Sequence, residues 1–463
     1  MQPMMKWNGK RVIILGGARQ GLAAARWLTR HGAIVTVNDR RSPEAMAAAR
    51  ATLADIPVTW VLGSHPLELL DNAEILCISG GIPLNNPLVL AAIQRGVPLT
   101  NDTQIFMEVA PGLTIGITGS AGKSTTTSLV GLMAQLSMVD RPQSVFIGGN
   151  LGDPLLNYVD GMTADTLAIL EISSFQLEQM TISPNIAAVL NITPNHLDRH
   201  GSMQAYTAAK RRILDFQQPG DCAILNRSDA GSWNLRGEVH GRMISFGSGD
   251  FPGDQEGTFL SDGRLYMRQG GEQISLLRAD QIRLRGEHNV MNVLAAFAIG
   301  FAAGLPLDAM LSAVMDFRGV ADRLEFVREW NGSQWYNDSI ATAPERTMAD
   351  IRSFSEPIVL MLGGRDKDLP WEALAGLVRQ RVENVVLFGE AAEKISKALD
   401  QASGPLPLTI ERCKNLRDAV QAAARLAKPG SIVLFSPGGT SFDEFEDFEQ
   451  RGKAFRKWVS ELS

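Results

Sequence analysis

The stretch TGSAGKSTTTS, from Thr118 to Ser128, decides the fold of the middle of this chain. It follows an apolar run at 113–117 that is typical of a buried strand, and it precedes an apolar run at 129–133 that continues as a helix. Glycines between a strand and a helix let backbone N–H groups turn inward, and the helix N-terminus adds the positive end of its dipole. The unit is therefore predicted to be a phosphate-binding loop.

The residue types in this stretch suit a polyphosphate. Lys123 would bring a mobile positive charge to the β- and γ-phosphates, and a hydroxyl directly after it could hold Mg²⁺. The usual Walker spacing needs Gly where Ile117 stands, so the sequence fits the narrower variant TG-x-x-GKST. A plain Gly/Ser-rich turn would account for the glycines but not for the Lys-Ser-Thr-Thr run. The predicted phosphate-contacting residues are Gly119, Ser120, Gly122, Lys123, Ser124 and Thr125.

Length and composition indicate a globular chain of several domains. With 463 residues the chain is too long for one core, and we expect three domains. Apolar residues make up 45% and charged residues 20%, which allows large cores and argues against extended disorder. A net charge of −6 argues against nucleic acid as the main partner, so local basic groups would have to meet a polyphosphate.

Cysteine usage and the N-terminal sequence bear on the compartment. The three cysteines, Cys77, Cys222 and Cys413, lie far apart without metal-ligand spacing, and we expect thiols in a reducing compartment. The first ten residues lack an apolar signal core, and no run reaches the roughly 18 apolar residues of a membrane span. We therefore expect a cytoplasmic protein without membrane insertion.

The first predicted domain, residues 1–108, opens like a Rossmann fold. A strand leads into the turn Gly16-Gly-Ala-Arg-Gln-Gly21 and a helix, and the next strand ends in Asp39, which could bind a ribose hydroxyl. Ala18 replaces the middle glycine of the dinucleotide fingerprint, which disfavours a redox dinucleotide and leaves another nucleotide open. Strands are predicted at residues 11–15, 33–39, 74–79 and 97–100.

The second predicted domain, residues 109–317, places polar residues at the ends of apolar strands. Glu171 ends one strand, where a second Mg²⁺ ligand is expected beside a phosphate loop. Another strand runs directly into His196 and Asp198, and ligands of α/β sheets bind at such strand ends. A structural role is the alternative for His196, whereas His200 is expected on the surface.

Two predicted helices and a glycine-rich segment complete this domain. Lys210 lies in a helix at 204–216, among basic residues that are typical of a solvated face. A later helix presents Asn289 and Asn292 on one side because three residues separate their positions. The alternating segment from Gly247 to Gly271 is predicted to form a small β-appendage.

The third predicted domain covers residues 318–463. Its apolar runs indicate parallel strands separated by helices, and small or polar residues end each run, which marks the carboxyl ends of the strands as a working edge. These runs are residues 335–342, 357–364, 384–389 and 431–439. The predicted fold class is therefore α/β, with a phosphate-loop ATPase domain between two Rossmann-like domains.

With these motifs in view, the chain resembles the Mur ligases, the ATP-dependent amide ligases that build the peptidoglycan stem peptide. The likeness covers nearly the whole chain, and the runs at 171–178 and 448–452 are most similar to the glutamate-adding branch. The blocks in family order are TGSAGKST from Thr118, EISSFQLE from Glu171, NITPNHLDR from Asn191, GEHNVMN from Gly286, NDS from Asn337, GGRDK from Gly363 and SPGGTS from Ser436.

The resemblance implies a three-domain Mur ligase architecture and an activity. The first domain would bind UDP, the central domain ATP, and the third domain would bind glutamate and close over the site. The implied reaction joins glutamate to UDP-N-acetylmuramoyl-L-alanine, with ATP and two Mg²⁺ sites, in a protein expected to be a monomer. A uridine diphosphate in place of NAD would also explain why the glycine turn tolerates Ala18.

The resemblance also implies residue roles at matching positions. Lys210 would be carbamylated, which turns a cation into a carboxylate-like metal ligand. The implied catalytic residues are Lys123, Glu171, His196 and Lys210, and the implied metal ligands are Ser124, Glu171, His196 and Lys210. Further ATP contacts would come from Asn292, Arg323 and Asp338. UDP-substrate contacts would come from Gly16, Gly17, Arg19, Gln20, Asp39, Arg40, Gly80 and Asn150. Glutamate contacts would come from Thr342, Lys367, Ser441 and Phe448.

Two positions depart from the family pattern. Asp322 stands where glutamate-adding relatives often carry His, and Ile340 stands where most of the D-glutamate ligases carry a lysine that faces the side-chain carboxylate. An isoleucine cannot pair a carboxylate, so Lys367 would have to meet this charge, or Arg346 or Arg365 from a new direction. We expect D-glutamate, with L-glutamate as the alternative.

Three other classes of protein are alternatives to a glutamate-adding Mur ligase. A folylpolyglutamate-synthase-like ligase would also add glutamate, but a Rossmann-like UDP domain ahead of the phosphate loop is not expected there. A P-loop transport or signalling ATPase would lack the blocks of the third domain. A non-catalytic regulator with a ligase fold is disfavoured because Lys123, Glu171, His196 and Lys210 are all present.

Overall fold

The computed structural model describes residues 6–140, 144–249 and 255–463. Three sheets organise the chain, and the chain divides into two compact units. One unit holds the residues up to 283 together with 287–317, and the other holds 284–286 together with 318–463. Within the described part of the chain, no helix has the length and apolar character needed to cross a membrane.

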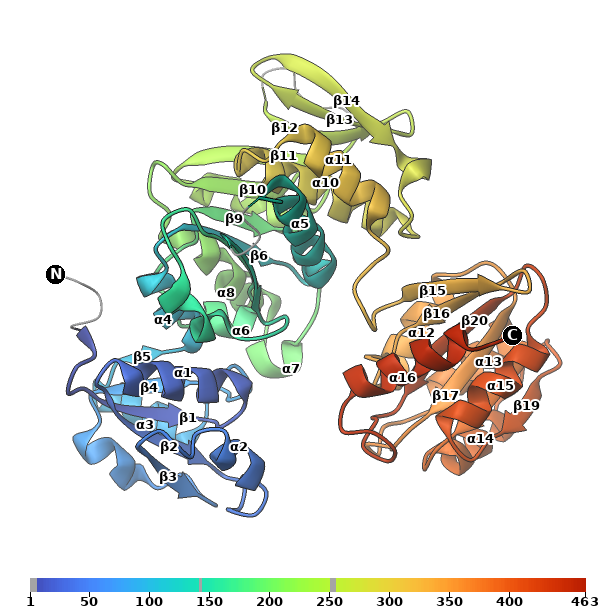
Figure 1. The fold of residues 1–463 in the computed structure, drawn as a ribbon, viewed down its shortest axis with the longest axis horizontal. Coiled ribbons are helices and arrows are strands. Elements are labelled where there is room, and N and C mark those ends of the chain that lie inside the picture. The colour runs from blue at the N-terminus through green and yellow to red at the C-terminus, as the bar shows by residue number, and fades with distance from the viewer. Residues whose placement is uncertain (1–5, 141–143, 250–254) are drawn as a thin grey trace. The chain divides into compact units, whose positions relative to one another are not determined.

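The first sheet has five parallel strands in the order β3-β2-β1-β4-β5 (Figure 1). The helix after β1 packs so closely on the preceding turn that a Cβ on Gly21 would lie 1.9 Å from the Gly16 carbonyl oxygen, and only glycine fits there. The strands are β1 (Arg11–Leu15), β2 (Ile34–Asp39), β3 (Val58–Leu62), β4 (Ile75–Ile78) and β5 (Leu99–Thr100). The helices are α1 (Arg19–Arg30), α2 (Ala47–Ala51), α3 (Pro87–Gln94) and α4 (Asp102–Val109).

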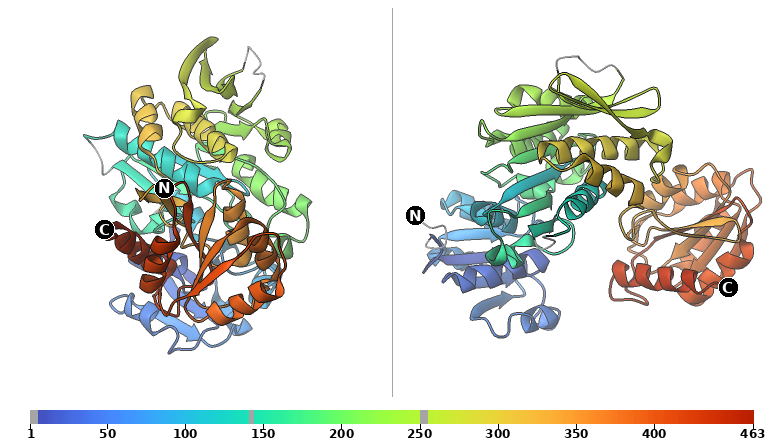
Figure 2. Two further views of the ribbon diagram at one scale, coloured as in Figure 1. Left: turned by 90° about the vertical axis from the view of Figure 1, so that its right-hand side faces the viewer. Right: turned by 45° about the horizontal axis from the view of Figure 1, so that its top comes forward.

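The central sheet has nine strands in the order β14-β13-β12-β11-β10-β9-β6-β8-β7. Figure 2 shows the ribbon from two further sides. It is parallel from β7 to β12, and β13 and β14 are antiparallel. The strands are β6 (Leu113–Thr118), β7 (Val145–Gly149), β8 (Leu167–Glu171), β9 (Ile186–Val189), β10 (Cys222–Asn226), β11 (Arg242–Ser248), β12 (Gly257–Ser261), β13 (Arg264–Gln269) and β14 (Glu272–Arg278).

Seven α-helices accompany this sheet in the described residues, and α5, α10 and α11 pack against one another. They are α5 (Lys123–Ser137), α6 (Ser174–Leu177), α7 (Leu197–His200), α8 (Met203–Asp215), α9 (Ala230–Trp233), α10 (Glu287–Ala302) and α11 (Leu307–Asp316).

The segment from Gly247 to Gly271 differs from the predicted appendage. Residues 250–254 lie outside the described residues, but β12 pairs with β11 and β13 pairs with β12. The strands of this segment therefore extend the central sheet instead of forming a separate appendage. Pairing with β12 gives hydrogen-bond partners to the backbone groups at the edge of β11.

The third sheet has the order β15-β16-β20-β17-β18-β19 and is parallel except for β15. Alternate residues of β17 enter two different cores, Leu360 with Leu362 on one face and Val359 with Met361 on the other. The strands are β15 (Glu325–Trp330), β16 (Ser333–Asn337), β17 (Ile358–Gly363), β18 (Asn384–Phe388), β19 (Thr409–Arg412) and β20 (Ile432–Gly438). The helices are α12 (Pro344–Arg352), α13 (Glu372–Arg381), α14 (Ala392–Gln401), α15 (Leu416–Leu426) and α16 (Phe448–Ser460).

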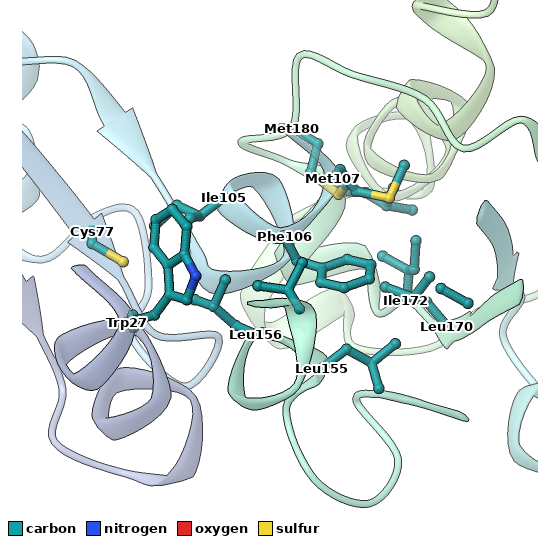
Figure 3. Packing of buried hydrophobic residues seen from close by; sticks show 14 of the residues in the cluster. Trp27, Cys77, Ile105, Phe106, Met107, Leu155, Leu156, Leu170, Ile172 and Met180 are labelled. Atoms are coloured by element: carbon teal, nitrogen blue, oxygen red, sulfur yellow. The ribbon is translucent and has the colours of Figure 1, made fainter. Parts of the chain in front are cut away.

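One continuous core joins the first sheet to the central sheet. Phe106 of α4 lies between Trp27 of α1 and the strand residue Leu170, and Leu156 lies beside it (Figure 3). All four side chains are at least 97% buried. The indole N–H of Trp27 also donates to Asp160 Oδ1 at 2.8 Å. The first and central sheets therefore share a core within one compact unit.

Leu156→Ala tests this shared core. Leu156 is 1% exposed, so the substitution leaves a cavity and should lower the free energy of unfolding of this unit by about 2–5 kcal/mol in urea denaturation. Leu90→Ala is the control, because Leu90 of α3 is 45% exposed and its loss should cost about 1 kcal/mol or less. Equal costs for the two variants would contradict the shared core.

Candidate functional site

The phosphate loop lies between β6 and α5, as the sequence predicts. Gly122 caps α5 with φ +83°, and a Cβ there would lie 2.2 Å from Asn292 Oδ1 of α10. Asn191, which follows β9, holds the loop from the other side by accepting from the Ser120 N–H at 3.0 Å through its carbonyl and from the Ala121 N–H at 2.8 Å through its side chain. Contacts from two other elements thus fix the loop backbone.

Two lysines approach this loop from different helices. Lys123 donates to the Gly119 carbonyl at 2.7 Å, and Lys210 of α8 donates to the same carbonyl at 2.9 Å and to Thr118 Oγ1 at 3.3 Å. Lys210 is 1% exposed, so the solvated face suggested by the neighbouring basic residues is wrong for this side chain. Burial and the Lys123 charge hold the pKa of Lys210 well below its ordinary value, although Glu171 acts in the opposite direction.

Ser124 and Glu171 meet beside the loop. Ser124 Oγ donates to Glu171 Oε2 at 2.6 Å, and Asn150 Nδ2 donates to Glu171 Oε1 at 2.8 Å. Glu171 is 3% exposed at the end of β8. A hydroxyl and a carboxylate are oxygen donors of the kind that Mg²⁺ prefers, so this pair fits such an ion.

Tyr206 is a site residue that the sequence reasoning missed. Its hydroxyl lies 3.1 Å from Ser120 Oγ, and the Lys210 ammonium lies 4.8 Å from its ring centroid. Tyr206 precedes Lys210 by four positions on α8, so both side chains lie on one face of the helix. That spacing could have revealed it once Lys210 was chosen.

His196 and His200 have different positions. His196 is exposed with φ +52° at the start of α7, and its ring meets the Phe175 ring edgewise at 5.1 Å. Among the described residues no group of three or more His, Cys, Asp and Glu side chains could hold a metal. The His200 side chain is 1% exposed and meets Glu178, so the predicted surface position is wrong.

The turn after β1 is shaped by Asp39. Gly16 has φ +99°, and the Gly17 N–H donates to Asp39 Oδ2 at 2.9 Å. Arg41 pairs with both carboxylate oxygens, at 3.0 and 2.7 Å. Although burial alone would raise it, these hydrogen bonds lower the pKa of Asp39 below its usual range. Arg40 is exposed, and the assignment of both residues to UDP stays a prediction.

A pocket of about 210 Å³ gathers three of the residues predicted to bind UDP. Arg19 and Gln20 line it from α1, and Asn150 lines it from the end of β7, where the Asn150 amide also contacts Glu171. The Gly80 N–H lies 3.4 Å from Gln20 Oε1. Residues that follow strands of both sheets of the first unit thus line one cavity.

The second unit gathers acidic and hydroxyl groups after β16. Asp338 is fully buried, and its Oδ1 accepts from the Leu324 N–H at 2.8 Å. Leu324 directly follows Arg323, which is predicted to contact ATP. Burial and the Asp338 carboxylate raise the pKa of Asp350 well above its ordinary value. Arg346 lies 4.0 Å from Asp338 Oδ2.

The predicted glutamate residues lie along the same unit. Lys367 Nζ is 3.3 Å from Thr342 Oγ1, whereas Arg365 is paired twice with Glu390, at 2.8 and 3.0 Å. Ser441 is 2% exposed, and the carbonyl of Phe448 accepts from Ser339 Oγ at 2.8 Å.

Asp322 has a structural role in the same unit. Its Oδ1 accepts from Asn337 Nδ2 and from Arg456, both at 2.8 Å. A Cβ on Gly452 of α16 would lie 1.6 Å from this oxygen, so Asp322 and Gly452 pack in contact. The carboxylate therefore helps to fix α16 against the end of β16.

Comparison with known proteins identifies the class. Three family models match in succession: "Mur ligase MurD-like, N-terminal domain" over residues 10–101, "Mur ligase middle domain" over 117–300, and "Mur ligase, glutamate ligase domain" over 322–439. The chain belongs to the Mur ligase family, as its resemblance predicted.

The curated relatives narrow the likeness within this family. The UDP-N-acetylmuramoylalanine–D-glutamate ligase of Symbiobacterium thermophilum is 37% identical over 454 residues, 98% of each chain. The protein of the same name from Acidobacterium capsulatum is 39% identical over 458 residues, 98% of this chain and 97% of that one.

Solved structures show the same fold at lower identity. The UDP-N-acetylmuramate-alanine ligase MurC of Thermotoga maritima has a TM-score of 0.56 at 18% identity and covers 98% of this chain and 100% of that one. MurF of Acinetobacter baumannii has a TM-score of 0.55 at 17% identity, covering 97% and 93%. The predicted three-domain α/β Mur ligase architecture is thereby confirmed.

Gly122→Ala should weaken nucleotide binding. The new Cβ would push Asn292 away and strain a backbone at φ +83°, and we expect a loss of about tenfold or more in ATP affinity, measured by calorimetry. Gly201→Ala is the matched control, because Gly201 has φ +75° but no atom within 4 Å of the added Cβ. A similar loss in both variants would attribute the effect to backbone strain alone.

Proposed function

We propose that this chain is an ATP-dependent amide ligase that adds D-glutamate to UDP-N-acetylmuramoyl-L-alanine during peptidoglycan precursor synthesis. Its full-length relatives carry this activity in their names. The observation that carries the proposal is the convergence of Lys123, Lys210 and the Ser124–Glu171 pair on one phosphate loop. The domains proposed for the three parts of the reaction are residues 1–108, 109–317 and 318–463.

The reaction needs activation because a carboxylate and an ammonium do not form an amide in water. The muramoyl-alanine carboxylate attacks the γ-phosphorus of ATP and gives an acyl phosphate and ADP. The neutral glutamate amine then attacks the acyl carbon, and inorganic phosphate leaves through a tetrahedral intermediate. Catalysis consists mostly of alignment and charge neutralisation.

The residues at the phosphate loop supply these effects. Lys123 would neutralise the transferring phosphoryl group, and the loop N–H groups would orient the β- and γ-phosphates. Asn292, fixed against Gly122, would contact the adenine side of ATP. Ser124 and Glu171 would hold one Mg²⁺, and His196 with carbamylated Lys210 a second; when bound, these ions offset the phosphate charge.

Carbamylation of Lys210 is part of the proposal. A neutral lysine amine attacks CO₂ to give a carbamate and release a proton, and the lowered pKa of Lys210 keeps the amine neutral at a lower pH than in an ordinary lysine. The resulting oxygens would sit in the buried position that now places Nζ beside Thr118 and Gly119.

The proposal also covers the oligomeric state, the compartment and the other classes of protein. We propose that the protein works as a monomer in the cytoplasm, where ATP and the nucleotide substrate are available. The match of residues 10–101 to a MurD-like first domain disfavours a folylpolyglutamate synthase, and the match of 322–439 to a glutamate ligase domain disfavours a transport ATPase.

The L-enantiomer of glutamate is the second candidate, and Ile340 favours it. Ile340 carries no charge at a position where most of the D-glutamate ligases have lysine, and Arg365 is already paired with Glu390. Two other cations near this edge are Lys367, beside Thr342, and Arg346, beside Asp338. A cation that approaches from another direction can reverse the preferred chirality.

Lys123→Ala should abolish turnover without unfolding the protein. The transition-state charge loses its cation while no core packing is lost, so kcat should fall by about 100-fold or more, roughly 2.7 kcal/mol or above. Phosphate release that depends on both substrates measures the effect, and thermal unfolding checks the fold. Turnover near the wild-type level would show that the loop has been misassigned.

Lys210→Ala should be inactive and partly rescued by acetate. The small carboxylate would fill the place of the carbamate oxygens, and rescue should saturate with acetate concentration. Chloride at the same ionic strength is the control. Intact mass of the native protein in bicarbonate buffer provides a second readout, and a lysine that carries no added CO₂ with Mg²⁺ and nucleotide bound would contradict the carbamate.

The glutamate enantiomer is settled by ADP formation with each enantiomer separately. We expect turnover with D-glutamate and the muramoyl-alanine nucleotide, and little with L-glutamate. Turnover with L-glutamate alone would establish the second candidate. Turnover with neither enantiomer would mean that the third domain binds a different amino acid.

A further inference from the structure

The ring of Phe175 organises the segment that carries His196. Phe175 belongs to α6, four positions after Glu171. The Arg199 guanidinium carbon lies 3.7 Å from its ring centroid, the His200 ring stacks on it at 5.2 Å with an interplanar angle of 11°, and the His196 ring meets it edgewise at 5.1 Å. Three residues of one short segment therefore rest on a single aromatic side chain.

His200 holds the segment 196–200 in place through both of its ring nitrogens. Its Nδ1 lies 2.9 Å from Glu178 Oε1, and its Nε2 lies 3.0 Å from Ser174 Oγ, so both ring nitrogens bind to α6 or to the residue that follows it. Glu178 also faces Arg199, whose charge opposes the rise that burial causes in the pKa of Glu178. The segment 196–200 is thus held to α6 by ring contacts and by hydrogen bonds.

Arg199 then reaches the first domain. Its two terminal nitrogens donate to the carbonyls of Gly80 and Ile82, at 3.0 and 2.8 Å. A planar guanidinium presents two terminal nitrogens at a fixed separation, whereas an ammonium presents a single nitrogen. The ring of Phe175 packs against the guanidinium group while the terminal nitrogens bind the carbonyls, so both kinds of contact orient the fork.

Arg199 and the 79–82 loop that it binds form a contact that we call the clasp. This loop in turn touches the glycine turn of the first domain. Ser79 Oγ donates to the Gly16 carbonyl at 2.8 Å, and the Gly80 N–H approaches Gln20 Oε1 at 3.4 Å. Gln20 in turn lines the cavity shared with Asn150. A chain of contacts therefore runs from α6, beside the phosphate loop, to the turn at 16–21.

We propose that Arg199, seated on Phe175, is a positioning residue that sets the placement of the 79–82 loop and the glycine turn relative to the phosphate loop. The inference rests on the proposed function. The nucleotide end of the muramoyl substrate would be held at the glycine turn while its carboxylate meets the γ-phosphate. The spacing between these two sites then decides how well a substrate of fixed length binds and reacts.

Arg199→Ala tests the clasp by its effect on one substrate only. Binding of UDP-N-acetylmuramoyl-L-alanine to the full-length protein without ATP, measured by calorimetry, should weaken about tenfold or more because two hydrogen bonds to a charged donor are lost. The KM for this substrate should rise in parallel, while the KM for ATP stays within about twofold.

Arg26→Ala is the matched control. Arg26 also joins the first and central domains, through Asn157 Oδ1 at 2.9 Å, but it does not touch the 79–82 loop. We expect unchanged nucleotide affinities in this variant. Equal losses in the Arg26 and Arg199 variants would overturn the proposal, because they would indicate a general weakening of the domain contact.

Variants of the ring and of the charge separate positioning from folding. Phe175→Tyr keeps the ring and should behave like the wild type, whereas Phe175→Leu should lose substrate affinity in the same direction as Arg199→Ala. Arg199→Lys keeps the charge without the fork and should be intermediate. If Phe175→Leu and Arg199→Lys both retain wild-type affinity, neither the ring nor the fork positions the loop.

Hydrogen exchange gives a readout that is independent of the proposed reaction. In Arg199→Ala, amide exchange of the peptide containing residues 79–84 should accelerate, while the same peptide in Arg26→Ala should match the wild type. Unchanged exchange in Arg199→Ala would overturn the clasp itself. Accelerated exchange in a protein that does not turn over the muramoyl nucleotide would uphold the clasp and refute the proposed function.

Discussion

The phosphate loop depends on contacts that hold its backbone from outside. A glycine-rich turn that points its N–H groups inward gains no rigidity from its own side chains. Asn191 holds Ser120 and Ala121, Asn292 packs on Gly122, and the buried Lys210 binds the Gly119 carbonyl. Residues from β9's end, α10 and α8 therefore all serve one loop, and the arrangement of the central domain follows from that requirement.

The strand order converts this requirement into a site. In the central sheet β6 lies between β9 and β8, and β7 lies next to β8. Because the strands are parallel, their carboxyl ends meet at one edge, which brings Asn191, Glu171 and Asn150 around the loop after β6. Glu171 reaches Ser124 for this reason, although 46 residues of chain separate the two positions.

The first and central sheets share a core, and this affects how a long substrate can be bound. Phe106 and Leu156 bury the junction, and Arg199 clasps the loop of the first sheet from the central one. A substrate that extends from the glycine turn to the phosphate loop then meets two sites at a fixed spacing. The second unit has its own two cores and carries its own polar edge after β16, where Asp338 is buried.

The sequence by itself determined the local motifs and many of the elements, because strand and helix patterns and the glycine turns at 16–21 and 119–122 depend on neighbouring residues. The tertiary structure decided which distant groups meet. Burial of Lys210, the inward position of His200, the role of Tyr206 and the clasp of Arg199 arise from contacts between elements far apart in sequence. Periodicity indicates which side of a helix is apolar, but it does not indicate which partner covers a charged side chain. Local sequence therefore does not distinguish a buried lysine from an exposed one.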